Sequence, residues 1–282
     1  MNPIYLQQFI REVLNEDIGM GDITTESIVP EKHRSSYVFR VKHPGVVAGL
    51  SIAERVFQEL DASLTWMSLV QDGERVEPGT IIARITGPTR AILTGERVAL
   101  NLMQRLSGIA TLTRSLVDQI HDLPCRVLDT RKTTPGLRQL EKYAVRMGGG
   151  TNHRMGLSHG VMIKDNHIAM AGSLAKAIEL VRARTGHMVQ IEVEADTLTQ
   201  VEEILAFDID VILLDNMDPD MLRRAVKMID GKVVTEASGG VTPETIRAVA
   251  ETGVDAVSLG FITHSAIALD IGLDFEKEER GT

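Results

Sequence analysis

The sequence predicts an α/β protein whose C-terminal half is a parallel barrel. Apolar, strand-like runs recur there, and most begin about 22 to 27 residues apart. Segments with the helical period separate them, as in SLAKAIELVRART, and this alternation is typical of a parallel sheet covered by helices. The runs cover 126–129, 161–165, 188–196, 210–216, 232–240 and 256–260, and 268–275 is a candidate seventh.

A doubly wound open sheet is the alternative architecture for the same alternation. No glycine-rich fingerprint follows the first strand, although a dinucleotide-binding doubly wound fold would carry one there. The regular spacing of the runs therefore favours a barrel, which would be incomplete because only six or seven strands are available.

The first 112 residues mix helical and strand patterns. Helices are expected over 4–15, 51–60 and 89–108, strands around a Pro-Gly turn over 36–49, and a β-meander over 68–88. Residues 16–30 have the composition of a loop. We therefore expect an N-terminal domain over 1–112 and a barrel domain over 113–267, with the tail 268–282 a candidate to join the first domain.

Composition excludes several classes of function. The 282 residues carry a formal net charge of -9 and a single cysteine, Cys125, so no intrachain disulfide can form. No basic tract suits nucleic acid, no apolar run approaches the ~18 residues of a membrane span, and the N-terminus lacks a signal pattern. We expect a cytoplasmic protein that binds neither nucleic acid nor membrane.

Positive charge is nevertheless concentrated in one stretch. Between Arg131 and His167, seven Lys or Arg residues stand against two acids. Arg131, Lys132 and Lys164 follow predicted strands, at the barrel face where active sites form. Arg138, Lys142 and Arg146 instead recur at helical spacing, which is typical of a solvated face or of ion pairs with Glu141. The stretch predicts a site for a small, highly anionic ligand.

Carboxylates and glycines complete the predicted barrel mouth. Alternation places Glu192 and Glu194 on one face of a strand, and Asp215 ends the next. Such oxygens suit Mg²⁺ with a phosphate ligand, a developing cation, or simple pairing with the lysines. The glycine-containing turns at 238–240 and 258–260 follow the last two clear strands, where barrels commonly bind phosphate.

Ten short motifs, taken in order, resemble those of the quinolinate phosphoribosyltransferase family over nearly the whole chain. They are GDITT (21–25), GERVALN (95–101), SGIAT (107–111), DTRKTTPGLR (129–138), GGGTNHR (148–154), KDNH (164–167), EVE (192–194), LDN (214–216), EASGG (236–240) and LGFITHS (259–265). The resemblance implies an N-terminal α/β sandwich followed by an incomplete α/β barrel. It also implies a pentosyltransferase that converts quinolinate and phosphoribosyl pyrophosphate to nicotinate mononucleotide, pyrophosphate and CO₂ in NAD biosynthesis.

The resemblance further implies a role for each motif residue. Quinolinate is expected to bind Arg97, Arg131, His153, Arg154 and Lys164, and the 5′-phosphate to bind Ser238, Gly239, Gly260 and His264. Lys132, Glu194 and Asp215 are the expected catalytic residues, and the two acids also bind Mg²⁺; no organic cofactor is expected. A homodimer or hexamer (a trimer of dimers) would share its active sites, with Arg97 donated by the neighbouring subunit.

Three alternatives remain at this point. Lys164 at a strand end is placed as a Schiff-base lysine would be in a barrel lyase. A paralogue of the molybdenum-transport-associated type would keep the scaffold with another role. A non-catalytic phosphosugar-binding protein would need no pair of acids such as Glu194 and Asp215.

Overall fold

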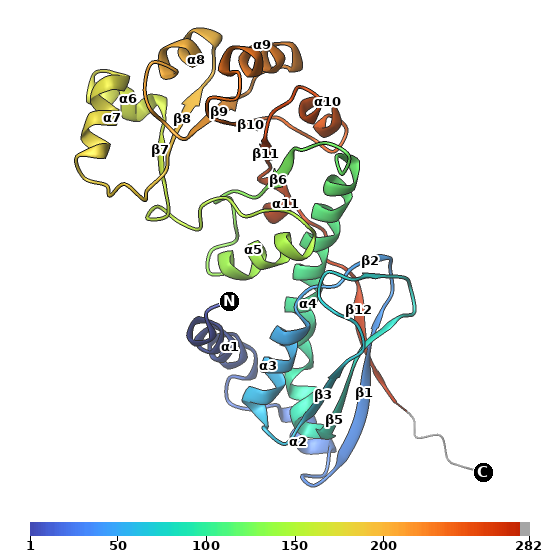
Figure 1. The fold of residues 1–282 in the computed structure, drawn as a ribbon. Helices are drawn as coiled ribbons and strands as arrows, with labels where there is room; N and C mark the ends of the chain where they lie inside the picture. Colours follow the sequence, from blue (N-terminus) through green and yellow to red (C-terminus); the bar gives the residue numbers. More distant parts are fainter. Residues whose placement is uncertain (277–282) are drawn as a thin grey trace. The chain divides into compact units, whose positions relative to one another are not determined.

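The computed structural model describes residues 1–276, which form two compact units (Figure 1). The first unit holds residues 1–112, 139–149 and, of the described residues, 265–276, and the second holds 113–138 and 150–264. Residues 139–149 thus group with the first unit, although in sequence they lie inside the expected barrel domain. Of the expected tail, 277–282 lie outside the described residues.

The first unit is built on an antiparallel sheet. Its strand order is β12 (Ile271–Phe275), β1 (Arg34–Val41), β5 (Ile81–Pro88) and β3 (Thr65–Ser68), and β2 (Gly45–Val46) pairs separately with β4 (Arg75–Val76). Phe39 of β1 and Trp66 of β3 pack against Phe57 of helix α3 (Leu50–Leu60), with ring centroids 5.1 to 5.9 Å apart. This aromatic cluster joins the sheet to a helical layer, as in a sandwich.

The helices of this unit correct two expectations from the sequence. Helix α1 (Pro3–Ile18) runs past the expected end, and α2 (Ile23–Ile28) lies where a loop was expected. Asp22 caps α2 because its side chain accepts the backbone N–H of Thr25. Such a cap stabilises even a short helix, and the glycines on either side of Met20 mask it in the sequence pattern.

Helix α5 (Arg138–Met147) is a third correction. Glu141 and Lys142 are both 0 % exposed, and Glu141 accepts a hydrogen bond of 2.7 Å from Arg105 of α4 (Thr89–Gln119). Of the three cations spaced along α5, Arg146 is exposed, as a solvated face requires, whereas Lys142 is buried. Helical spacing shows which residues share a face, but not whether water or protein covers it.

The second unit contains six parallel strands, and their order identifies the architecture. The sheet runs β6 (Arg126–Leu128), β11 (Ala256–Ser258), β10 (Val234–Ser238), β9 (Val211–Asp215), β8 (Ile191–Ala195) and β7 (Val161–Ile163). Chain order is followed from β7 to β11, and the last strand pairs with the first. In a doubly wound sheet the order of the strands across the sheet would reverse at a switch point. No such reversal occurs here, so the sheet is a barrel.

The barrel is incomplete between β6 and β7. Instead of a strand, Thr151 lies beside β6: it donates its N–H to the carbonyl of Val127 and accepts the N–H of Asp129. The candidate seventh strand is not part of the barrel, because β12 pairs antiparallel with β1 in the first unit. The mixed α/β class and the six-stranded parallel sheet are confirmed.

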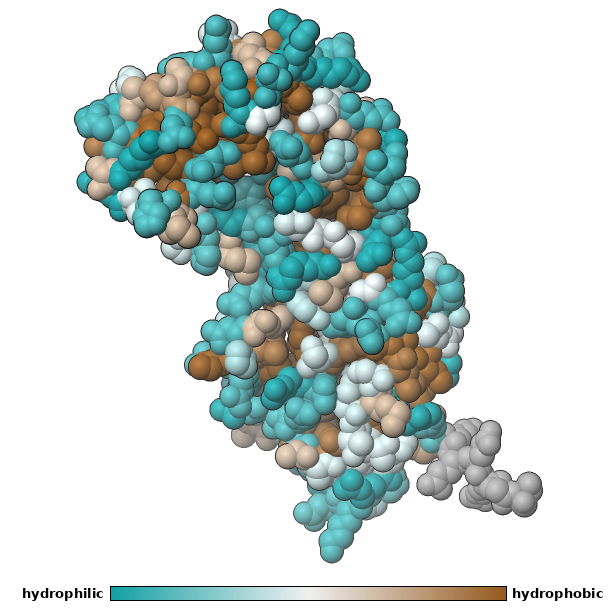
Figure 2. Space-filling model, in the orientation of Figure 1, coloured by the Kyte–Doolittle hydropathy of each residue, from teal (hydrophilic) through white to brown (hydrophobic). Residues whose placement is uncertain are grey.

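Helices follow the barrel strands. They are α6 (Asp165–Ala171), α7 (Leu174–Arg182), α8 (Leu198–Ile204), α9 (Pro219–Ile229), α10 (Ile246–Ala250) and α11 (Phe261–His264). Ser173, Thr197 and Asp218 cap α7, α8 and α9 through their side chains. On the face drawn in Figure 2, hydrophilic side chains predominate over these helices, and hydrophobic atoms show between them over β8–β10. Within residues 1–276, no helix is long and apolar enough to cross a membrane.

Candidate active site

The interior of the barrel is lined by every second residue of its strands. The register pairs Glu194 of β8 with Leu213 of β9, which in turn pairs with Glu236 of β10; Asp215 pairs with Ser238. Because side chains alternate along a strand, these residues point to one face. Two cavities use this face, one at the carboxyl ends of the strands and one at their amino ends.

We call the first the mouth cavity. It has a volume of about 410 Å³ and gathers eight of the twelve residues expected to form the site. Its lining is Thr130, Arg131, Lys132, His153, Arg154, Met162, Lys164, Glu194, Leu213, Asp215, Glu236, Ser238 and Ser258. Four of these are Lys or Arg and three are acids. The positive side chains come from segments far apart in sequence, so the fold itself concentrates charge in an acidic chain.

The loop after α5 is fixed to the end of β6 by a buried carboxylate. Asp129, fully buried, accepts hydrogen bonds from the side-chain amide of Asn152 at 2.5 Å and from the backbone N–H of His153 at 2.9 Å. Arg154 then donates to the carbonyl of Gly160 at 2.8 Å. These bonds place His153 and Arg154 in the mouth cavity, and burial followed by the nearby charge of Arg131 lowers the pKa of Arg154.

Two acids of the mouth cavity lie on neighbouring strands, Glu194 on β8 and Asp215 on β9. Lys164, at the end of β7, forms an ion pair with Glu194 of β8. Burial, and then the charges of Glu194 and Asp196, raise the pKa of Asp215. Carboxylates that repel one another inside a cavity are stabilised by a cation or by a positively charged substrate atom. Glu194 and Asp215 thus form an acidic strip beside the cationic wall.

The expected phosphate residues lie on the turns after β10 and β11. Ser238 lines the mouth cavity, and Gly239 has a φ of +85° with its backbone against Asn216, since a Cβ there would lie 2.2 Å from the Asn216 side-chain oxygen. Gly260 lies beside Lys132 and His264, because a Cβ there would lie 2.7 Å from Lys132 and 3.5 Å from His264. Close backbone approach of this kind suits an anion held by N–H groups.

Arg97 occupies a different place. It is exposed on α4 in the first unit, whereas every residue described as lining the mouth cavity belongs to the second. Arg97 is not among the residues that line the mouth cavity.

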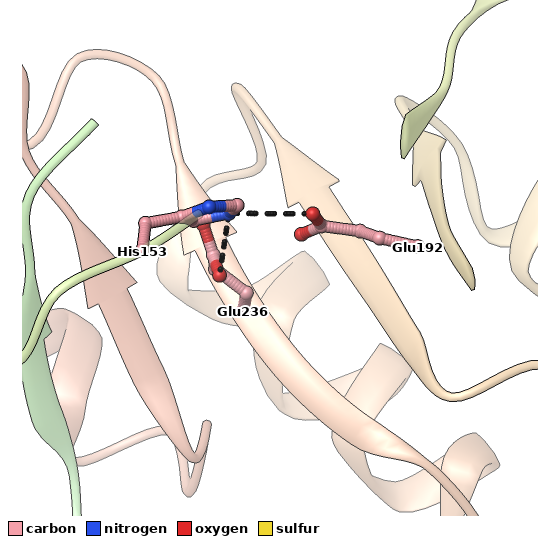
Figure 3. Close-up of side chains that lie close together, drawn as sticks. All are labelled: His153, Glu192 and Glu236. Atoms are coloured by element: carbon pink, nitrogen blue, oxygen red, sulfur yellow. Dashed lines mark ion pairs between the residues drawn. The ribbon is translucent and has the colours of Figure 1, made fainter. Parts of the chain in front are cut away.

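Sequence reasoning missed one group, formed by His153, Glu192 and Glu236 (Figure 3). The Nε2 atom of His153 lies 3.3 Å from Glu192 and 3.5 Å from Glu236. Desolvation by burial, and then the charge of Glu192, raise the pKa of Glu236 to about 7. The period of two was the available signal, since Glu236 shares a face with Ser238 just as Glu192 does with Glu194.

Fold and site together define a class: an α/β-barrel enzyme that acts on small, multiply charged anions at the carboxyl ends of its strands. Comparison with known proteins gives the family. The model of the quinolinate phosphoribosyl transferase N-terminal domain matches residues 22–107, and that of the C-terminal domain matches 109–274. The chain belongs to the quinolinate phosphoribosyl transferase family.

Individual relatives agree with the family models. The chain is 48% identical to a probable nicotinate-nucleotide pyrophosphorylase [carboxylating] of Bacillus subtilis, covering 97% of this chain and 94% of that one. It is 42% identical to a quinolinate phosphoribosyltransferase [decarboxylating] of Nicotiana glauca, covering 98% and 84%. Among solved structures, NadC from Streptococcus pyogenes has a TM-score of 0.94 at 40% identity, covering 98% and 99%.

Proposed function

We propose that this chain transfers the phosphoribosyl group of phosphoribosyl pyrophosphate to quinolinate and removes one carboxylate, giving nicotinate mononucleotide, pyrophosphate and CO₂. The family and the names of its relatives support the reaction. The observation that carries the proposal is the mouth cavity itself, in which Arg131, Lys132, Arg154 and Lys164 face the acidic strip of Glu194 and Asp215. Quinolinate, with two adjacent carboxylates, suits the cationic wall, and the ribosyl group suits the acids.

Each side chain then has a role that its position supports. Arg131, Arg154 and Lys164 bind the quinolinate carboxylates, and Arg forks are suited to such planar groups. The Nε2 of His153 faces two acids and the ring lines the same cavity, so His153 connects bound quinolinate to Glu192 and Glu236. Lys132 neutralises the departing pyrophosphate. Ser238, Gly239, Gly260 and His264 hold the 5′-phosphate at the last two turns.

The acids act on the ribosyl half of the reaction. When pyrophosphate leaves, positive charge develops at the anomeric carbon, and fixed carboxylates stabilise such charge electrostatically. Glu194 and Asp215 are also the residues that would hold Mg²⁺, which prefers one or two carboxylates together with substrate phosphates. The raised pKa of Asp215 fits this, because the site favours a cation beside it. Bound Mg²⁺ would neutralise charge on the pyrophosphate.

Arg97 supports a shared active site. An exposed Arg on α4 that is not among the residues lining the mouth cavity is available to a second copy, and a two-fold dimer would form two equivalent sites. We therefore propose a homodimer, or a hexamer of three such dimers, in which Arg97 binds a quinolinate carboxylate of the neighbouring subunit. We place the reaction in the cytoplasm, as composition predicts.

A Schiff-base lyase is less well supported, because an imine at Lys164 would need none of the three other cations, Arg131, Lys132 and Arg154, that line the same cavity. The test is direct. The protein is incubated with quinolinate, phosphoribosyl pyrophosphate and Mg²⁺, and pyrophosphate, CO₂ and nicotinate mononucleotide are quantified. Equal amounts of the three support the proposal. No product, or covalent trapping of Lys164 by borohydride with a carbonyl substrate, would contradict it.

A further inference from the structure

Two buried carboxylates inside the barrel share one histidine (Figure 3). Glu192 is 6% exposed and Glu236 is 4% exposed, and in each the Oε1 atom is buried without a hydrogen-bond partner. Both acids approach the same Nε2 atom of His153, at 3.3 and 3.5 Å. Two ionised carboxylates in this setting would be strongly destabilised, so the group must hold either a cation or an extra proton.

The other ring nitrogen decides between these two possibilities. The backbone N–H of Arg154 donates to Nδ1 of His153 at 2.7 Å, so Nδ1 is an acceptor and the ring proton resides on Nε2. A metal ion bound at Nε2 would need that lone pair and would force a proton onto Nδ1, against the Arg154 N–H. The arrangement therefore favours a proton shared between the carboxylates.

Glu236 is the acid that retains this proton. The groups facing it are Glu192 on β8, His153, and Asp129 at the end of β6. Burial and the charge of Glu192 raise its pKa to about 7, although His153 and Ser258 favour the ionised form. A carboxyl group kept neutral in this way can act as a general acid near neutral pH.

Glu236 and Glu192 differ in the cavities that they line. Both line a second cavity of about 330 Å³ at the amino ends of the barrel strands, which also reaches Gln190 and Val211. Of the two, Glu236 alone also lines the mouth cavity, where the cationic wall would hold the pyridine ring. Glu236 thus connects a buried proton to the place where the substrate reacts.

We propose that Glu236 is the general acid that protonates the pyridine carbon from which CO₂ departs. This inference rests on the proposed function. When the C2–carboxylate bond breaks, CO₂ leaves and the electron pair stays on C2, beside the quaternised ring nitrogen. C2 takes the proton of Glu236 as the CO₂ departs, so the C2–H bond forms in the same step and CO₂ release depends on this proton. Glu236 becomes a carboxylate beside the Nε2–H of His153. Glu236 regains a proton from solvent after the nucleotide leaves.

The test separates the two halves of the reaction in Glu236→Gln. Glutamine keeps the size of the side chain but supplies no acidic proton. In single turnovers with quinolinate labelled in the 2-carboxylate, pyrophosphate should appear at close to the wild-type rate. CO₂ release should slow about 10²–10⁴-fold, the usual contribution of a general acid, and the dicarboxylate nucleotide should accumulate. The assignment would be overturned if pyrophosphate release and CO₂ release slowed by the same factor, or if CO₂ still appeared as fast as pyrophosphate.

Glu192→Gln is the matched variant, because it alters the same histidine contact. Removing the charge of Glu192 lowers the pKa of Glu236, so CO₂ release should decline at lower pH than in the wild type. A merely structural role predicts no such shift.

If Glu236→Gln fails to fold, the wild type still tests the idea. Its CO₂ step, but not its pyrophosphate step, should slow as pH rises through about 7; identical profiles would refute the inference. A wild type that forms no pyrophosphate would refute the proposed function instead.

Discussion

Replacing Asp215 with Asn should stabilise the protein while removing most of its activity. The pKa of Asp215 is raised by burial and by the charges of Glu194 and Asp196. Because this folded-state pKa lies above the unfolded value, the neutral form favours folding: its contribution is present at low pH and is lost as pH rises through the folded pKa. Asn is neutral at every pH, so Asp215→Asn should raise the melting temperature at pH 8 more than at pH 4. The turnover number should fall about 10²–10³-fold, or ~2.7–4 kcal/mol of transition-state stabilisation.

The assay combines thermal unfolding at both pH values, without substrate or added metal, with the rate of pyrophosphate release. Asp208→Asn is the control, because this side chain is 96% exposed and pairs with Arg182 at the surface. It should change stability by less than about 0.5 kcal/mol and leave turnover unchanged. An Asp215→Asn protein that melts lower at pH 8, or that keeps wild-type turnover, would refute the reasoning.

Two further predictions concern the shared site and the phosphate turn. Arg97→Ala and Lys132→Ala homodimers should each be nearly inactive, and mixing them with subunit exchange should restore activity; exchange without recovery would show that Arg97 does not act in trans. Gly239→Ala should raise the KM for phosphoribosyl pyrophosphate and lower the melting temperature, because its Cβ would meet Asn216 at 2.2 Å with a φ of +85°. Gly240→Ala, at a φ of +64° with open space, should do less; equal effects would contradict the steric argument.

The barrel was predictable because its strands repeat one local pattern. Alternation on β8 places Glu192 and Glu194 inward from sequence alone, and the six strand positions all match the structure. The sheet that β12 joins was not predictable in this way. Its pattern is that of any strand, and its pairing with β1 joins residues 230 to 238 positions apart. Local periodicity cannot choose between a seventh barrel strand and an edge strand of another sheet.

The burial of charged side chains was the other feature that could not be predicted from the sequence. Lys142 is spaced like a solvated lysine and is fully buried, and Glu236 resembles any strand acid until its neighbours are known. The raised pKa of Glu236 depends on Glu192 and His153, which lie on different segments. Motifs identify which residue types meet at the barrel mouth. The proton that they share depends on three-dimensional distances.

The measurement that tests the account most directly is the ratio of specificity constants for quinolinate and nicotinate. The cationic wall of the mouth cavity is matched by two carboxylates, and nicotinate would leave one cation unpaired. Losing one charge-assisted pair at such a partly exposed site costs ~1.5–3 kcal/mol, so kcat/KM should favour quinolinate about 10–10²-fold. Equal specificity constants for the two acids would contradict the claim that this cavity is built for a dicarboxylate.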